Sequence, residues 1–120
     1  MPFPVSDPVG NVLRSALDGL AVQQRVTANN LANVDTPDFI ATHVDFEGPL
    51  RAAMADGSIA GGDVAPVTEA STDPVGVNGN NVDVATETMS AMQATFQYQL
   101  LSRAVGDRFG LISTAIGAGA

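Results

Sequence analysis

A chain of 120 residues has room for one domain, and the absence of cysteine excludes disulfides and thiolate metal sites. Its five phenylalanines and single tyrosine are too few to predict a thick, self-contained core. The net charge is −8 and lysine is absent, which argues against nucleic-acid binding because no basic patch can replace phosphate counterions.

The acidic excess lies in the middle of the chain. Residues 34–83 carry nine acidic side chains and one arginine, whereas the two flanks balance to zero. The first ten residues contain neither a basic run nor the apolar core of a signal peptide. No stretch approaches the roughly 20 apolar residues of a membrane span. The chain is therefore expected not to span a membrane, and to be cytoplasmic unless a route without a cleaved signal exports it.

The first predicted helix covers residues 8–34 and follows a flexible N-terminus at residues 1–7. Asp7 is a good N-cap and Pro8 suits the first helical position. Placed at about 100° per residue, apolar side chains gather on one face of this helix. They are Val9, Leu13, Ala16, Leu17, Leu20, Ala28 and Leu31.

The acidic middle segment, residues 35–82, is predicted to be extended and partly disordered, with little β-structure. Partial alternation over residues 39–50 favours a short extended piece, and residues 50–55 favour a helical turn or two. Residues 57–79 are rich in glycine, proline and acids. Such a composition buries too little apolar area to offset the entropy of ordering, so this part is expected to be flexible in the free chain.

The second predicted helix covers residues 83–117, with Asp83 as a plausible N-cap. One of its faces carries Met89, Met92, Phe96, Leu100 and Leu111. Another face carries Ala94, Tyr98, Leu101, Val105, Phe109, Ile112 and Ile116. Because a single antiparallel partner covers only one face of a helix, part of this apolar surface needs another cover. Either a neighbouring molecule or the folded-back middle segment provides it.

These elements predict a mainly α fold, in which the two terminal helices pair as an α-helical hairpin or coiled coil. The side chains expected to pair the helices within one subunit are Leu13, Leu17, Leu20, Leu31, Met89, Met92, Phe96 and Leu100. The side chains expected to contact other subunits are Tyr98, Leu101, Val105, Phe109, Ile112 and Ile116.

Catalytic equipment is not apparent in the sequence. His43 is the only histidine, and no serine lies in a nucleophile elbow. Residues 78–83 resemble a calcium loop, but Val82 stands where an oxygen ligand belongs, so a turn before a capped helix is the better interpretation. The chain is expected not to be an enzyme and to bind no metal, no cofactor and no small-molecule substrate.

Two blocks of sequence carry a resemblance to a known family. The run Asn29-Asn30-Leu31-Ala32-Asn33-Val34-Asp35-Thr36-Pro37 is a far more elaborate stop than a helix needs, and it resembles the N-terminal signature of bacterial flagellar rod and hook proteins. The run Gly79-Asn80-Asn81-Val82-Asp83, followed by Glu87 and Met89, is similar to the C-terminal signature of proximal rod subunits. One departure is Asp38-Phe39, where these proteins often carry Gly-Tyr.

This resemblance implies a structural subunit of the bacterial flagellar basal body. Such subunits assemble through their terminal helices, help to transmit torque and line the export channel. The implied partners are other copies of the chain, FlgC-like and FlgF-like rod subunits, the adaptor FliE and the flagellar export gate. The implied location is the rod in the periplasmic space, reached by type III export without a cleaved signal peptide. Asn29, Asn30, Asn33, Asp35 and Thr36 would fix the turn after the first helix, and hydrogen bonds from this set to a neighbouring subunit are a further expectation.

Other interpretations of the sequence stay open. One is a related, FlgC-like rod subunit, and another is a free-standing helical adaptor or binding protein. The adaptor would melt cooperatively and independently of concentration, whereas a rod subunit would gain helicity with concentration or with partners. A hydrolase built on His43 is a distant third.

Overall fold

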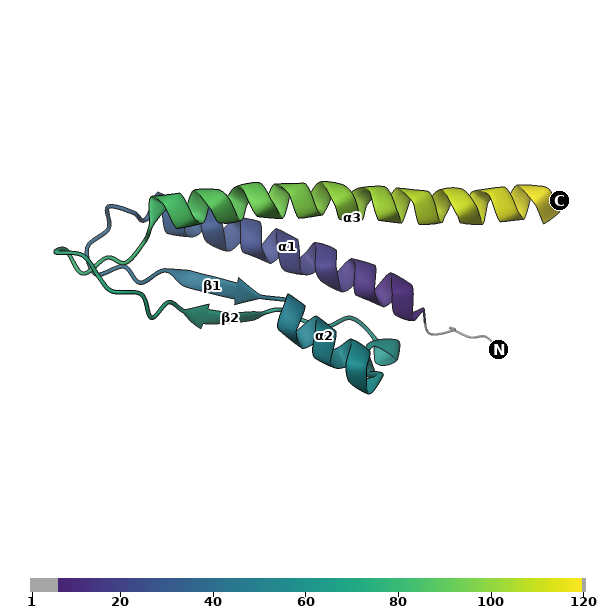
Figure 1. Cartoon of the computed structure of the whole chain (residues 1–120), viewed down its shortest axis with the longest axis horizontal. Helices are drawn as coiled ribbons and strands as arrows, with labels where there is room; N and C mark the ends of the chain where they lie inside the picture. Colours follow the sequence, from purple (N-terminus) through teal and green to yellow (C-terminus); the bar gives the residue numbers. More distant parts are fainter. Residues whose placement is uncertain (1–6, 120) are drawn as a thin grey trace.

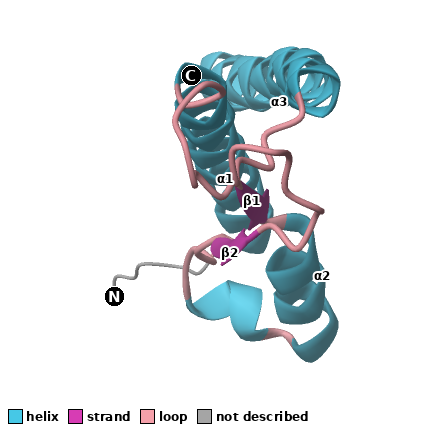
Figure 2. Ribbon diagram, turned by 90° about the vertical axis from the view of Figure 1, so that its left-hand side faces the viewer, coloured by secondary structure: helices cyan, strands magenta, loops and turns pink. Residues whose placement is uncertain are grey.

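The computed structural model describes residues 7–119 of the chain. The flexible N-terminus expected at residues 1–7 lies outside this range except for Asp7. The molecule is elongated, measuring 67 × 27 × 19 Å along its principal axes. Two long antiparallel helices, α1 and α3, lie side by side, and a small layer of strands and short helices covers α1 on the side away from α3 (Figures 1 and 2).

Helix α1, Pro8–Ala32, begins where the sequence predicts. The carboxylate of Asp7 accepts a hydrogen bond of 3.1 Å from the backbone N–H of Gly10, which satisfies one of the free donors of the first turn. At the other end, the backbone N–H of Asn33 closes the last turn onto the carbonyls of Asn29 and Asn30. The helix therefore ends inside the Asn29–Pro37 motif.

Helix α3, Val84–Gly119, is the longest element. Asp83 caps it, because its Oδ1 accepts hydrogen bonds from the backbone N–H groups of Ala85 and Thr86 at 3.0 and 3.3 Å. At 36 residues against 25, α3 is longer than α1, and its C-terminal end extends past the start of α1 (Figure 1). The Arg108 guanidinium meets the Asp7 carboxylate at 2.5 Å and marks the point where α1 begins.

The middle segment contains more regular structure than its composition predicts. Strands β1, Thr42–Asp45, and β2, Val67–Ala70, form a two-stranded antiparallel sheet, with helix α2, Glu47–Asp56, and the 3₁₀ helix η1, Ser58–Gly61, between them. Buried polar side chains of α1 hold this segment. Asn11 donates to the carbonyl of Ile59 at 2.8 Å, and Ser15 accepts from the N–H of Val64 at 2.8 Å. Flexibility of residues 57–79 in the free chain stays a prediction.

The core is small and lies between α1, α2 and η1. It consists of buried Ala16, Leu50, Ala53 and Ile59, with Val12, Phe46, Val64 and Leu101 packed against it. Gly19 of α1 lets the ring of Phe46 approach the helix backbone, because any Cβ at this position would overlap the Phe46 side chain. The core therefore depends on small residues and close contact rather than on aromatic bulk.

The helices pair through a face of α3 that differs from the predicted one. Met89, Met92 and Phe96 are 71, 68 and 61 % exposed, and Leu100 is half-exposed beside Leu20. The first three side chains thus make no buried interface with α1 within one copy. The four predicted leucines of α1 are covered: Leu20 is fully buried, and Leu13, Leu17 and Leu31 are half-buried.

The face of α3 that meets α1 instead carries Glu87, Ala94 and Leu101. Ala94 is fully buried, and its small side chain permits a close approach of the two helix backbones. Glu87 is bound by Asn30 of α1, which fixes the rotation of α3 at its N-terminal end. A specific polar contact and close packing therefore decide the orientation of a helix whose two faces are both apolar.

Candidate functional site

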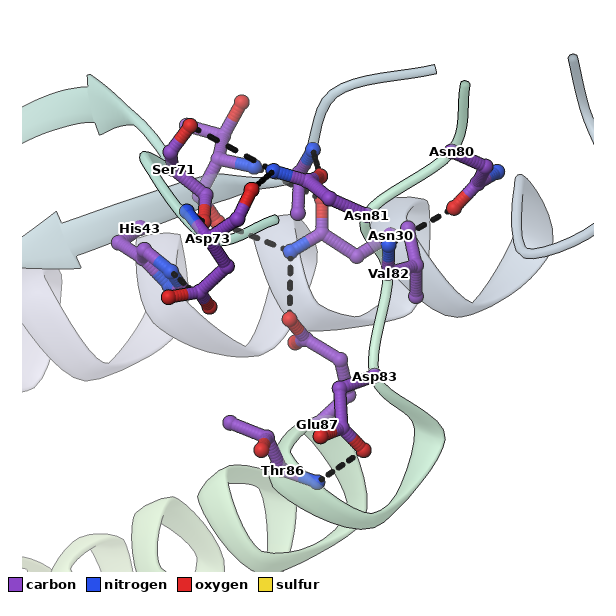
Figure 3. Close-up of polar contacts among 12 residues, drawn as sticks. Asn30, His43, Ser71, Asp73, Asn80, Asn81, Val82, Asp83, Thr86 and Glu87 are labelled. Carbon is purple, nitrogen blue, oxygen red and sulfur yellow. Dashed lines mark hydrogen bonds and ion pairs between the residues drawn. The ribbon is translucent and has the colours of Figure 1, made fainter. Parts of the chain in front are cut away.

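The two sequence blocks meet at one end of the molecule, where α1 ends and α3 begins. Four asparagines join them, and we call this set the asparagine junction: Asn30, Asn33, Asn80 and Asn81. Figure 3 shows three of them, Asn30, Asn80 and Asn81, between the end of α1, the strands and the first turn of α3. Three of the four are buried, and Asn33 is half-buried.

Asn30 is fully buried, and its side-chain amide pairs with the free edge of β1 as a neighbouring strand would. Its Oδ1 accepts from the backbone N–H of Thr42 at 3.1 Å, and its Nδ2 donates to the carbonyl of the same residue at 2.8 Å. The second Nδ2 hydrogen reaches Glu87 Oε1 at 3.0 Å (Figure 3). One side chain thereby joins α1, the outer edge of β1 and the first turn of α3.

Asn33 and Asn80 close the turn that follows α1. Asn80 donates from Nδ2 to two carbonyls, those of Asn33 and Thr36, both at 2.8 Å. The Thr36 hydroxyl donates to Asn33 Oδ1 at 3.1 Å, and Asn80 Oδ1 accepts from the N–H of Val82 at 2.7 Å. The Asn80 side chain of the loop before α3 therefore binds two backbone carbonyls of the loop after α1 and holds the two loops together.

Asn81 ends the two-stranded sheet. Its Oδ1 accepts from the backbone N–H of Ala41 at 2.7 Å, and its Nδ2 donates to the carbonyl of Asp73 at 3.1 Å. A longer contact of 3.5 Å reaches the carbonyl of Ser71, the residue that pairs with Ala41 across the sheet. The side-chain amide therefore takes the place of a peptide group at the end of the ladder (Figure 3).

Asp38 stands at the turn where the sequence departs from the resemblance to rod proteins. Its φ of +61° lies in the left-handed region, where glycine has no steric penalty and aspartate is tolerated. A backbone hydrogen bond of 2.9 Å from its N–H to the carbonyl of Asn78 holds the residue there, and Gly79 leaves room for its carboxylate. The φ at this position suits a glycine better than an aspartate.

The junction offers hydrogen bonds rather than reactive groups. Among residues 7–119, no buried side-chain nitrogen or oxygen lacks a hydrogen-bond partner. His43 is exposed and lies 4.0 Å from the Asp73 carboxylate. The described part of the chain contains no cluster of three or more metal-ligating side chains. The hydrogen bonds of the junction therefore fix the geometry of its loops.

The predicted motif residues divide into two groups. Of the five residues expected to fix the turn, Asn30, Asn33 and Thr36 make side-chain hydrogen bonds there, and Asn29 Oδ1 accepts a longer, exposed one of 3.4 Å from Asn33. Asp35 is exposed, as are Ala32 and Pro37 of the motif, and Leu31 is half-buried. Sequence reasoning did not assign Asn80 and Asn81 to the site, although both stand in the second resemblance block. Two adjacent asparagines before a helix cap were the available signal, because loop asparagines commonly bind backbone groups.

A second candidate surface follows α3 away from the junction. Of the side chains expected to contact other subunits, Tyr98, Phe109, Ile112 and Ile116 are exposed, with Phe109 and Ile116 at 66 and 69 %. Leu101 and Val105 are half-buried, and Leu101 packs against the core of its own copy. Leu101 thus belongs to the contacts within the subunit.

This surface is also without charge over long stretches. No ionisable side chain occurs in residues 88–102 apart from Tyr98, or in residues 109–120, and Arg103, Asp107 and Arg108 separate the two stretches. Among them, Arg108 pairs with Asp7. The N–H of Gly10 and the Arg108 guanidinium hold the pKa of the Asp7 carboxyl below its usual value. No described helix is long and apolar enough to cross a membrane.

Comparison with known proteins identifies the family. Residues 11–39, which contain the first motif, match the family described as "Flagella basal body rod protein". The flagellar basal body rod protein FlgB of Bacillus subtilis is 30 % identical over 118 residues, covering 89 % of this chain and 92 % of that protein. The FlgB of Borreliella burgdorferi is 29 % identical and that of Cereibacter sphaeroides 30 %, covering 83 and 78 % of this chain and 89 and 82 % of those proteins.

The match to the Bacillus subtilis protein covers 89 % of this chain, so it includes the asparagine junction and parts of both terminal helices. A protein at this level of identity over nine-tenths of the chain shares the family and not only an isolated motif. The chain therefore belongs to the FlgB family of flagellar basal-body rod proteins.

Proposed function

We propose that this chain is a structural subunit of the proximal rod that assembles through its terminal helices and completes its fold on assembly. The observation that carries the proposal is the exposed apolar surface of α3, on which Met89, Phe96, Phe109 and Ile116 are all more than 60 % exposed. Apolar patches that monomeric proteins leave uncovered mark interaction sites. A rod subunit surrounded by neighbours covers such surface on every side.

The finer assignments rest on the family and on this surface. We propose as partners other copies of the chain, FlgC-like and FlgF-like rod subunits, the adaptor FliE and the export gate. The rod in the periplasmic space is the proposed location, with export that uses no cleaved signal peptide. In this position the packed helices transmit torque and surround a channel for later export substrates.

A thin core suits a subunit that travels unfolded before it assembles. The buried apolar side chains are mostly alanines and single leucines or isoleucines, and no disulfide has to be broken. Neighbours that bind only the folded chain add stability by mass action, so the entropy of ordering is offset at the point of assembly. The same thin core therefore eases unfolding for export and makes the stability of the fold depend on neighbouring subunits.

The proposal is tested by complementation in a flagellated bacterium that lacks its own copy of this gene. Ile116→Asp places a charge on the exposed face of α3, and burial of an unpaired carboxylate opposes subunit packing. We expect export of the variant but loss of swimming. Thr114→Asp is the matched control, because this exposed residue lies on the other side of the helix.

Normal swimming of the Ile116→Asp strain would contradict the assembly surface. Failure of the wild-type chain to restore swimming in its natural host would contradict the rod assignment itself. Circular dichroism of the purified chain separates the free-standing adaptor, because a rod subunit gains helicity with concentration or with partners, whereas an adaptor does not.

A further inference from the structure

Three glycines of the chain follow an asparagine or an aspartate, in Asp18-Gly19, Asp56-Gly57 and Asn78-Gly79. In such a pair the backbone nitrogen of the glycine can attack the side-chain carbonyl carbon of the preceding residue, because glycine has no Cβ to shield that nitrogen. The product is a five-membered succinimide ring, which water opens again. The local structure decides whether the reaction occurs, and the three pairs differ in theirs.

The two aspartate pairs are protected. Gly19 lies inside α1 and packs against the ring of Phe46, so the helix holds its nitrogen away from the Asp18 side chain. The hydroxyl of Ser58, and then its backbone N–H at 2.8 Å, hold the pKa of the Asp56 carboxyl below its usual value. The ionised carboxylate is a poor electrophile. Neither pair therefore cyclises readily.

The Asn78-Gly79 pair lies in an exposed turn of the loop before α3. The Gly79 N–H donates to the carbonyl of Gly76 at 3.0 Å, and Gly79 has a φ of +79°. The exposed Asn78 side chain folds over the peptide bond that follows it, because its Oδ1 accepts from the backbone N–H of Asn80 at 3.1 Å. The reacting carbon and nitrogen therefore lie in one turn that is open to water. One backbone hydrogen bond, to Gly76, has to open before the nitrogen attacks.

The asparagines of the junction lack these properties. Asn30, Asn80 and Asn81 are buried, and their Nδ2 groups donate to backbone carbonyls. Asn33 is half-buried, and its Nδ2 donates at 2.8 Å to a carbonyl in the last turn of α1. Each of the four is followed by a residue with a Cβ, which shields the attacking nitrogen. Among the described asparagines, Asn78 is therefore the one that combines exposure with a following glycine.

We propose that Asn78 is a site of spontaneous deamidation, and that the isoaspartate formed there weakens the asparagine junction. The Gly79 nitrogen attacks Asn78 Cγ, so that a bond from this nitrogen to Cγ forms and the bond from Cγ to Nδ2 breaks. Nδ2 leaves as ammonia, and the proton that the Gly79 nitrogen loses balances the one that the ammonia gains. Water then adds to one of the two ring carbonyls and gives aspartate or isoaspartate. Water is the co-reactant, no oxidation occurs, and the inference goes beyond the proposed function.

Isoaspartate changes the main chain of this turn, whereas aspartate does not. In isoaspartate the main chain runs through Cβ and Cγ, which lengthens it by a CH2 group, and the former carbonyl becomes a free carboxylate. The carbonyl of Asn78 accepts from the N–H of Asp38 at 2.9 Å, and its Oδ1 accepts from Asn80. Asn80 in turn binds the carbonyls of Asn33 and Thr36. The added length and the new charge close to Asp38 therefore disturb the contact between the two loops.

Ageing of the purified full-length chain in mildly alkaline buffer tests the proposal. Samples taken over time are digested, and mass spectrometry of the separated peptides measures aspartate and isoaspartate at each asparagine. Ion exchange isolates the more acidic, deamidated chains, and urea denaturation measures their stability. Asn78→Ser is the matched control, because its hydroxyl can accept from the Asn80 N–H but carries no amide to lose. Asn78→Asp represents the product that keeps the normal main chain.

We expect Asn78 to lose its amide more than about tenfold faster than any other asparagine. The rate should rise with pH, because the Gly79 nitrogen has to lose its proton. Chains with isoaspartate should have an unfolding equilibrium constant raised roughly fivefold or more, since backbone donors and acceptors of the junction lose their partners. Asn78→Asp, and Asn78→Ser before and after ageing, should stay within about twofold of the unmodified wild type.

Several results would overturn the proposal. Deamidation at Asn78 that is no faster than at the junction asparagines would show that the turn protects it. Cleavage of the chain after Asn78 would show that Nδ2 attacks its own backbone carbonyl instead. Isoaspartate chains as stable as Asn78→Asp would show that the junction does not depend on this turn. An equal loss of stability in aged Asn78→Ser and aged wild type would assign the loss to another site.

Discussion

The two ends of α3 differ in how far a single copy covers and satisfies their side chains. At its N-terminal end, Glu87 and the asparagine junction form a closed hydrogen-bond network, and the described residues leave no buried side-chain donor or acceptor unpaired. At its C-terminal end, Phe109, Ile112 and Ile116 lie exposed on a helix that has passed its partner. One end is complete in a single copy, and the other is not.

The difference follows from how polar and apolar groups interact. A buried polar group without a partner costs about 1–3 kcal/mol and needs a partner of defined geometry, so a subunit has to satisfy it before it leaves water. Apolar contact is non-directional and roughly proportional to area. Exposed apolar surface is therefore tolerated in the free chain and covered later by a neighbour. The hydrogen-bonded loops are therefore fixed in the free chain, and the apolar surface of α3 stays exposed until a neighbour packs against it.

The largest expected effect on stability comes from removing the Asn30 side chain at the centre of the asparagine junction. Asn30→Ala leaves the N–H and C=O of Thr42 and the carboxylate of Glu87 without their partner. We expect a loss of roughly 2–4 kcal/mol in the free energy of unfolding, measured by urea denaturation. Asn29→Ala, next to it and exposed, is the control and should change stability by less than about 0.5 kcal/mol. Equal losses in the two variants would show that the junction does not depend on this side chain.

A glycine-to-alanine substitution should lower the free energy of unfolding where α1 is covered by Phe46 and raise it where α3 is uncovered. Gly19→Ala forces the Phe46 ring away from α1, and we expect a loss of about 1–3 kcal/mol in unfolding free energy. Gly106→Ala in α3 meets no atom within 4 Å, and alanine is the better helix former, so helix stability should rise by up to about 1 kcal/mol. Thermal melts of both variants at low concentration measure the contrast. A gain at Gly19 would contradict the described packing of Phe46.

A smaller effect is expected at the turn beside the junction. Asp38→Gly removes the strain of a left-handed residue and should raise the unfolding free energy by about 0.5–1 kcal/mol. Asp35→Gly, at an exposed turn position without a positive φ, is the comparison and should lower it. Chemical denaturation measures the unfolding free energies of the two variants against that of the wild type. Stabilisation by both would point to relief of the acidic charge rather than of backbone strain.

The smallest effect concerns the contact where α1 begins. The pKa of Asp7 is lowered in the folded chain, first by the N–H of Gly10 and then by Arg108, so its stabilising contribution is present above the usual aspartate value of 3.8. That contribution is lost as the pH falls through the lower, folded value. Asp7→Asn should therefore flatten the acid limb of the stability curve below about pH 4. An acid limb identical to that of the wild type would exclude a role for this carboxylate.

The start of each long helix was predictable because capping is local. Asp7 with Pro8, and Asp83 after the asparagines, carry the information within a few residues, and the structure places the caps there. The motif Asn29–Pro37 likewise predicted a turn fixed by side-chain hydrogen bonds. Local sequence thus determined where the helices begin and where the first one stops.

The pairing face of α3 was not predictable from the same rules. Apolar periodicity identifies both faces of α3 but does not show which of them packs against α1. The prediction that the bulkier methionine face packs against α1 is wrong, because Met89 and Met92 are exposed. The choice depends on distant partners: Asn30 of α1 binds Glu87, and Ala94 allows close approach. The order of the middle segment depended in the same way on Asn11 and Ser15, which lie far away in sequence.

Hydrogen exchange of the isolated chain, resolved along α3, tests most directly whether this helix is complete only in an assembly. In dilute solution we expect protected amides in residues 87–101, beside α1, and rapid exchange in residues 109–117, with protection of the latter appearing only as copies associate. Equal and strong protection of both stretches in a monomer would contradict the account.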